Sequence, residues 1–177
     1  MPGRPAWPAV LLAGILPAGG LLATGCGSGS PAQQHASPSR SASGLATGAQ
    51  RRALAARYLV IAKAGNRRLE IDFDGMAGRD RHNLRASLAD LRDAAATERL
   101  FDQRLLAIRF PPVTEAVART LYRVNQARAS LTVRIAGSVS LRQLDALKPR
   151  LTAANGPVEQ QVRLIRRQLG LPPPNTS

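Results

Sequence analysis

The clearest structural signal in the chain is NLRASLADLRDAAATERLFDQRLLAIRFPP (residues 83–112). Its apolar side chains recur every three or four residues, at Leu84, Leu88, Leu91, Ala95, Phe101, Leu105 and Ile108. This spacing places them along one side of an α-helix, because a helix makes one turn every 3.6 residues. Pro111 and Pro112 end the pattern, since proline lacks a backbone N–H and disfavours a helical residue before it. We therefore predict one long amphipathic helix over about residues 79–109.

Three further stretches carry the same spacing, and turn-forming residues separate them. The predicted helices cover about residues 48–73, 113–136 and 141–169, with breaks at Asp74-Gly75, Gly78 and Gly137-Ser138. No stretch shows the sustained two-residue alternation that is typical of strands. Four amphipathic segments joined by short connections favour antiparallel neighbours. We predict an all-α domain, an up-down-up-down four-helix bundle.

The last predicted segment contains Pro149 and Gly156-Pro157, which usually interrupt a helix. Its apolar positions nevertheless keep one register from Leu144 to Leu169, across both prolines. Because a continuous apolar stripe must face one core, we predict a single Pro-kinked helix rather than two unrelated helices. Ser140, just before this segment, is a residue type that caps helix N-termini.

The N-terminus has the pattern of an export signal. Arg4 precedes the 15-residue apolar run AVLLAGILPAGGLLA (residues 9–23), and Thr24-Gly25-Cys26 follow it. The run contains Pro17 and is shorter than the roughly 20 apolar residues of a membrane-spanning helix. We therefore expect residues 1–25 to be a signal peptide rather than a permanent anchor.

Cys26 is the only cysteine, which rules out an intrachain disulfide and a cysteine-based zinc site. The sequence before it, LATGC (residues 22–26), resembles a bacterial lipobox, although Ala23 stands where leucine is more usual. The resemblance implies cleavage between Gly25 and Cys26 and attachment of a diacylglyceryl group to the sulfur. Two acyl chains anchor a protein stably where one does not. The alternative is ordinary secretion with a free thiol.

The residues after Cys26 predict a flexible linker. Residues 27–47, GSGSPAQQHASPSRSASGLAT, are mostly Gly, Ser, Pro, Ala, Gln and Thr, which cannot bury enough apolar surface to fold. A linker of this composition has a reach of roughly 25 Å. We divide the chain into a signal peptide (1–25), a lipidated cysteine with its linker (26–47), a helical domain (48–171) and a disordered tail (172–177).

The layout of lipobox, linker and helical domain resembles uncharacterised putative lipoproteins of actinobacteria. Besides LATGC, two fragments carry the resemblance: ERLFDQRLLAIRFPP (residues 98–112) and LTAANGPVEQQVRLIRRQLGLPP (residues 151–173). The resemblance implies an extracytoplasmic location and a helical fold. It implies no activity and no site residues.

Candidate catalytic and metal sites fail on spacing. Three aspartates and a histidine fall within 11 residues, at Asp72, Asp74, Asp80 and His82, but a calcium loop starting at Asp72 would place Met76, Ala77 and Asn83 at ligand or glycine positions. We expect a turn there, with Asp80 capping the next helix. The helical segments contain no Glu-x-x-His pair, G-x-S-x-G elbow or Ser-x-x-Lys motif. We therefore predict no catalytic residue, no metal and no cofactor, and a protein that is not an enzyme.

The charge pattern is strongly basic, with a formal net charge of +14. Removing residues 1–25 leaves 24 basic and 11 acidic residues. We predict an anion-binding patch at Arg163, Arg166 and Arg167, because Arg163 and Arg167 are one helical turn apart. The alternative is a solvated helix face whose arginines pair with acids such as Asp90, Asp93, Glu98 or Asp102.

These features together predict a protein anchored by lipid to the outer face of the cell membrane. We expect a non-enzymatic module that contacts an anionic lipid, an anionic wall polymer or a protein partner. Export and the scarcity of aromatic residues argue against nucleic acid. The alternative is a small-ligand-binding or sensor lipoprotein, with a pocket between helices where the kink near Gly156-Pro157 opens the core.

Overall fold

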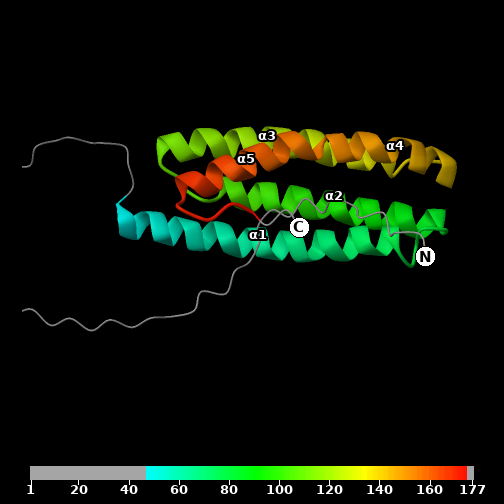
Figure 1. Ribbon diagram of the computed structural model, residues 1–177, viewed down its shortest axis with the longest axis horizontal. Coiled ribbons are helices and arrows are strands. Elements are labelled where there is room, and N and C mark those ends of the chain that lie inside the picture. Colours follow the sequence, from blue (N-terminus) through cyan, green and yellow to red (C-terminus); the bar gives the residue numbers. More distant parts are fainter. Residues whose placement is uncertain (1–46, 175–177) are drawn as a thin grey trace, which may run out of the picture.

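The computed structural model describes residues 47–174, and within this range the regular elements are all helices (Figure 1). They are α1 (Gly48–Ala77), α2 (Leu84–Leu106), α3 (Pro112–Ile135), α4 (Leu141–Ala153) and α5 (Asn155–Gln168). α1 packs on α2, α2 on α3, and α3 on α5, while α4 and α5 together make the fourth arm. The predicted all-α four-helix bundle is confirmed. No helix within residues 47–174 has the length and apolar content needed to cross a bilayer.

Side chains cap three of the four arms. Thr47 Oγ1 accepts a hydrogen bond from an α1 backbone N–H at 3.3 Å, and Asn83 Oδ1 accepts one from an α2 N–H at 3.1 Å. Ser140 Oγ caps α4 in the same way at 3.2 Å, which confirms its predicted role. α3 begins instead with Pro112, whose missing N–H would have no helical partner at that position.

The first connection comes later than predicted, because α1 continues through Asp74-Gly75 to Ala77. Gly75 is buried where α1 meets α2. A Cβ atom at Gly75 would lie 2.9 Å from Asp90 Oδ2 of α2. This glycine therefore leaves room for the Asp90 carboxylate of α2, whereas the sequence analysis predicts a turn there.

The prediction that Asp80 caps the second helix is also wrong. α2 begins at Leu84, and Asn83 is its N-cap. Asp80 lies in the preceding turn, where its main-chain carbonyl accepts a hydrogen bond from Ser87 Oγ at 2.7 Å. Its carboxylate instead accepts a hydrogen bond from Arg79 Nε at 2.7 Å.

The last arm bends by 30° and keeps a single apolar register, as predicted. The bend falls at Ala154, between α4 and α5, while Pro149 lies inside α4 and Pro157 in the first turn of α5. Ala154 keeps helical dihedral angles (φ −68°, ψ −12°), so the chain changes direction without a loop. The buried apolar residues of this arm are Leu144, Leu151, Val158, Val162, Ile165 and Leu169.

Three parts of the fold meet at one end of the bundle: the start of α1, the α2–α3 connection and the end of α5 (Figure 1). We call residues 47–57, 104–119 and 163–174 the proximal end. The distal end comprises residues 70–93 and 134–150, which hold the two other connections. Because α1 starts at the proximal end, residues 1–46 join the domain there.

Candidate functional site: a basic end with an apolar groove

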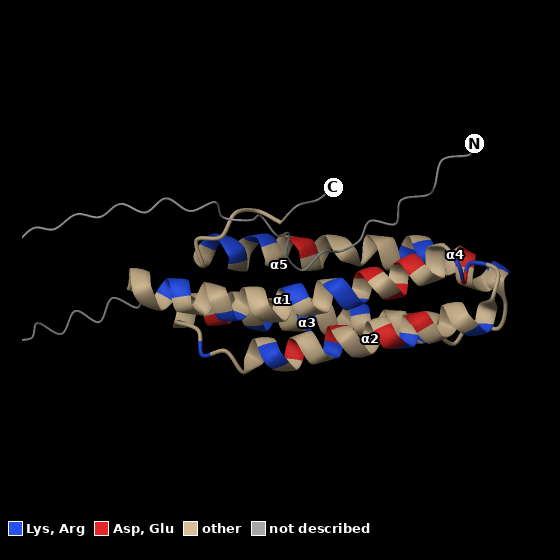
Figure 2. Ribbon diagram, turned by 90° about the horizontal axis from the view of Figure 1, so that it is seen from below, with Lys and Arg blue, Asp and Glu red and all other residues tan. Residues whose placement is uncertain are grey.

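The two ends of the bundle differ sharply in charge (Figure 2). The proximal end carries nine basic residues and one acidic residue, Glu115; the basic residues are Arg51, Arg52, Arg57, Arg104, Arg109, Arg119, Arg163, Arg166 and Arg167. The distal end carries eight basic residues against seven acidic ones, which are Glu70, Asp72, Asp74, Asp80, Asp90, Asp93 and Asp145. The excess positive charge of the domain is therefore concentrated where the chain enters it.

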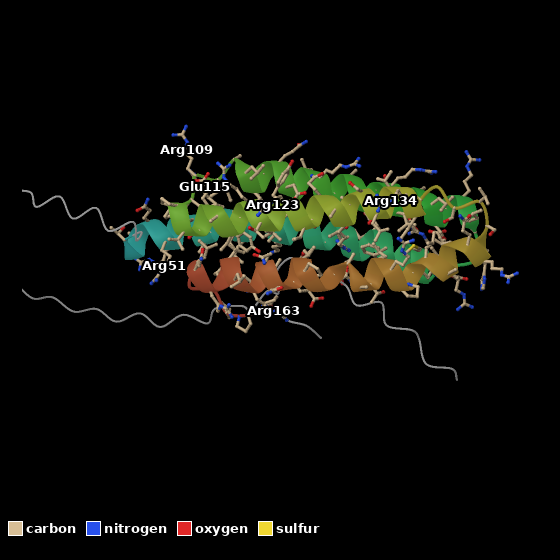
Figure 3. The ribbon with its side chains drawn as sticks, turned by 90° about the horizontal axis from the view of Figure 1, so that it is seen from above. Arg51, Arg109, Glu115, Arg123, Arg134 and Arg163 are labelled. Atoms are coloured by element: carbon tan, nitrogen blue, oxygen red, sulfur yellow. The ribbon has the colours of Figure 1, made fainter. Side chains whose placement is uncertain are left out.

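Eight of the nine proximal arginines are exposed, and only Arg166 is buried. Figure 3 shows Arg51 and Arg109 near the proximal end and Arg134 toward the distal end. Within residues 47–174, the one ion pair at this end joins Arg119 to Glu115, with Nη2 of Arg119 2.6 Å from Oε1. The remaining seven exposed arginines form no ion pair with the described residues, so their charge faces solvent.

The predicted patch of Arg163, Arg166 and Arg167 does not exist as a three-residue surface. Arg163 and Arg167 are exposed, but Arg166 is only 1% exposed because it lies on the core face of α5, four residues after Val162. Its Nε donates a hydrogen bond to the main-chain oxygen of Pro172 at 2.6 Å. Burial lowers the pKa of Arg166, and the nearby Tyr58 opposes that shift. The predicted lipidation and cleavage sites, Cys26 and Gly25, lie outside the described residues.

A groove of about 450 Å³ opens beside the α2–α3 connection at the proximal end. Its lining is mostly apolar, with three charged side chains: Leu105, Leu106, Ile108, Arg109, Phe110, Glu115, Ala118 and Arg119. Of these, Leu106 is 49% exposed. The groove therefore joins apolar surface to arginine side chains at the most basic part of the domain.

Near the kink, where the sequence analysis considered a pocket between helices, the structure shows buried polar contacts. Asn155, the first residue of α5, is 6% exposed, and its Oδ1 accepts a hydrogen bond from Arg128 Nε at 2.8 Å. Val158, one turn later, is completely buried. These contacts join the start of α5 to the middle of α3, while the groove described above lies at the α2–α3 connection.

A buried ion pair lies at the centre of this polar core. Arg128 of α3 and Glu98 of α2 are 2% and 0% exposed, and Nη1 of Arg128 donates a short hydrogen bond to Oε1 of Glu98. Burial raises the pKa of Glu98, and the guanidinium of Arg128 opposes that shift. Arg128 also lies over the ring of Phe73 from α1, 5.7 Å from its centroid.

A second buried carboxylate, Asp102, has no arginine beside it. Its oxygens accept hydrogen bonds from Asn125 Nδ2 and Gln126 Nε2, both at 2.9 Å. Burial raises the pKa of Asp102 to about 7; the two amide hydrogen bonds oppose the shift, and Glu98 adds to it. The sequence analysis named four acids as possible ion-pair partners of arginines. Of these, Glu98 pairs with Arg128, and Asp90 Oδ1 lies 3.8 Å from Arg79 Nη2.

The buried polar residues could have been found from their spacing. In α2, Glu98 and Asp102 continue the three-or-four-residue repeat that runs from Leu91 through Ala95 to Leu105. In α3 the same repeat places three buried polar residues, Asn125, Arg128 and Thr132, between the apolar residues Leu121 and Ile135. Polar residues at core positions indicate an internal network. The sequence analysis named Glu98 and Asp102 only as possible partners for arginines of a solvated helix face.

The acidic segment near the α1–α2 connection does not assemble a metal site. Within residues 47–174, no group of three or more His, Cys, Asp or Glu side chains is arranged to hold a metal ion. His82 is exposed, and its Nε2 accepts a hydrogen bond from Arg81 Nε at 2.7 Å. Asp72 is partly buried in α1, and burial raises its pKa to about 6.

Comparison with known proteins identifies no relative. No protein-family model, curated protein or solved structure matches this chain.

Proposed function

We propose that this chain is a lipid-anchored protein of the outer face of the cell membrane, and that its helical domain binds anionic lipid head groups through the proximal end. The observation that carries the proposal is the charge difference between the two ends, nine basic residues to one acidic at the proximal end against eight to seven at the distal end. The domain is in this view a non-enzymatic binding module.

The position of the linker supports this orientation. Residues 27–47 connect Cys26 to the start of α1, which is at the proximal end. A lipid on Cys26 would therefore hold the basic end of the bundle, rather than its nearly neutral end, close to the bilayer. The resemblance of the layout to actinobacterial lipoproteins supports the same location.

The charge available is enough to matter energetically. Basic residues held near an anionic membrane each contribute about 1 kcal/mol, and the attraction falls off within a Debye length. Seven exposed proximal arginines have no ion-pair partner within residues 47–174. They would add to the affinity of the acyl chains and would orient the domain on the surface.

The anchor is tested by detergent-phase partition and by the mass of the purified protein, compared between the natural chain and a Cys26→Ala chain that lacks the apolar residues 1–25. We expect the natural chain in the detergent phase with a diacylglyceryl adduct on Cys26, and the variant in the aqueous phase. A nonionic detergent has no anionic head groups, so attraction to the arginines does not contribute to the partition. An unmodified thiol, or a variant that still enters the detergent phase, would contradict the proposal.

The surface is tested separately, with the Cys26→Ala chain lacking residues 1–25. We expect it to sediment with vesicles that contain phosphatidylglycerol and not with vesicles of phosphatidylcholine alone. Raising the salt concentration should release it from the phosphatidylglycerol vesicles. Equal binding to both kinds of vesicle, or binding that salt does not weaken, would contradict a charge-based interaction.

A further inference from the structure

The groove beside the α2–α3 connection has a floor that suits a hydrocarbon chain. Leu105, Ile108, Phe110 and Ala118 line it and are each less than 9% exposed, so together they form a fixed apolar surface. The volume of about 450 Å³ lies within the range of roughly 300–1,000 Å³ that small-molecule sites occupy. The exposed side chain of Leu106, which also lines the groove, extends the apolar surface.

The rim of the same groove suits an anionic head group. Arg109 is exposed and forms no ion pair with residues 47–174, and Figure 3 shows its side chain pointing away from the bundle. Arg119, another lining residue, lies on α3, where Glu115 holds it with hydrogen bonds of 2.6 and 3.0 Å. One guanidinium is therefore available to an anion at once, and a second becomes available to any anion that displaces Glu115.

These two parts together select the occupant. A small anion such as phosphate would leave the apolar floor exposed to water, and an uncharged hydrocarbon would leave Arg109 unused. A molecule that joins one acyl chain to an anionic head group satisfies both parts. We propose that the groove binds a single acyl chain of an anionic lipid, with the head group on Arg109 and in competition with Glu115 for Arg119.

This inference rests on the proposed function, because the membrane would supply the lipid to the proximal end. It adds a stoichiometric site for one lipid molecule to a surface that otherwise attracts many head groups. The site would fix the rotation of the bundle on the bilayer, since the groove lies on the α2–α3 side of the proximal end.

The test is a calorimetric titration of the Cys26→Ala chain lacking residues 1–25 with octanoate, nonanoate and decanoate, all below their micelle concentrations. We expect one site whose affinity rises up to about fourfold with each added methylene, because each buried methylene contributes hydrophobic free energy. Decanol should bind more weakly than decanoate, since it lacks the charge. Binding that does not saturate, or an affinity that does not change with chain length, would overturn the proposal.

Variants at the rim assign the head group. Arg109→Ala should weaken decanoate binding about tenfold or more, as expected for the loss of a charged hydrogen bond. Glu115→Gln should strengthen it by releasing Arg119. The control Arg134→Ala removes an exposed arginine from the other end of α3 and should leave the affinity unchanged. If Arg134→Ala weakens binding as much as Arg109→Ala, the groove is not the site.

The vesicle measurement separates this inference from the proposed function. A chain that sediments with phosphatidylglycerol vesicles but shows no saturable decanoate binding overturns the groove site and leaves the proposed function standing. A chain that binds decanoate at one site, with the expected loss in Arg109→Ala, supports the groove site even if vesicle binding fails.

Discussion

Arg128 Nε donates a hydrogen bond of 2.8 Å to Asn155 Oδ1, which joins the middle of α3 to the first residue of α5. The same guanidinium pairs with Glu98 of α2 and lies over Phe73 of α1. A single buried cation therefore contacts the three other arms of the bundle. The bend at Ala154 places Asn155 within reach of this contact, which gives the kink a structural role beyond accommodating the prolines.

Removing one member of the buried ion pair should destabilise the fold strongly. We expect Arg128→Met to lower the free energy of unfolding by about 3–5 kcal/mol, because it leaves the Glu98 carboxylate buried without its cation. The double variant Glu98→Met/Arg128→Met should recover much of the loss, since no charge then remains unpaired. Urea denaturation measures both.

The exposed pair of Glu115 and Arg119 is the control for that experiment. Arg119 is 70% exposed, so Arg119→Ala should change the free energy of unfolding by no more than about 1 kcal/mol. An Arg128→Met variant no less stable than Arg119→Ala would show that the buried pair does not organise the core.

Asp102 should make the domain less stable as the pH rises from about 4 to about 7. Its pKa is about 7 in the folded chain against an ordinary value of 3.8, so across this range the folded state holds a proton that the unfolded state has released. One such proton lowers the free energy of unfolding by up to about 1.4 kcal/mol per pH unit, and its effect levels off above pH 7.

Asp102→Asn isolates this effect. The variant should match the natural chain near pH 5, where Asp102 is protonated in the folded state, and exceed it in stability at pH 8. The stability of the variant should still fall somewhat as the pH rises, because other acids, such as Asp72, have raised pKa values; that of Asp72 is about 6. A variant that is equally destabilised at both pH values would show that Asp102 acts through its hydrogen bonds and not through its proton.

Gly170 should tolerate alanine poorly. It has φ +70° and ends α5, with the Leu171 N–H bonded to the Arg166 carbonyl, so Gly170→Ala should cost about 1 kcal/mol. Thermal unfolding of the variant checks the sign; a variant as stable as the natural chain would contradict the account of this helix end.

Much of the fold could be predicted from the sequence because its signals are local. The apolar repeat around Leu88 and Leu91, the prolines at 111 and 112 and the Ser140 cap act within a few residues. The end of α1 could not be predicted, because Gly75 is explained by its contact with Asp90, which lies on another helix.

The candidate site could be predicted only in outline. The excess of arginine is visible in the composition, but its concentration at one end depends on which segments the fold brings together. Arg166 was assigned to the surface because arginine usually lies there, although its position after Val162 already places it on the core face. The lining of the groove comes from residues 105–119, but the groove forms only when the end of α2, the connection and the start of α3 fold against one another.

The central claim is that the proximal end faces an anionic membrane, and one comparison of two triple variants tests it most directly. Arg52→Glu/Arg57→Glu/Arg163→Glu reverses exposed charges at the proximal end and leaves the groove unchanged, while Arg85→Glu/Arg134→Glu/Arg142→Glu reverses as many at the distal end. In the Cys26→Ala chain without residues 1–25, we expect the proximal variant to lose binding to phosphatidylglycerol vesicles and the distal variant to retain most of it. Equal loss in both variants would show that net charge alone governs binding and would contradict the proposed orientation.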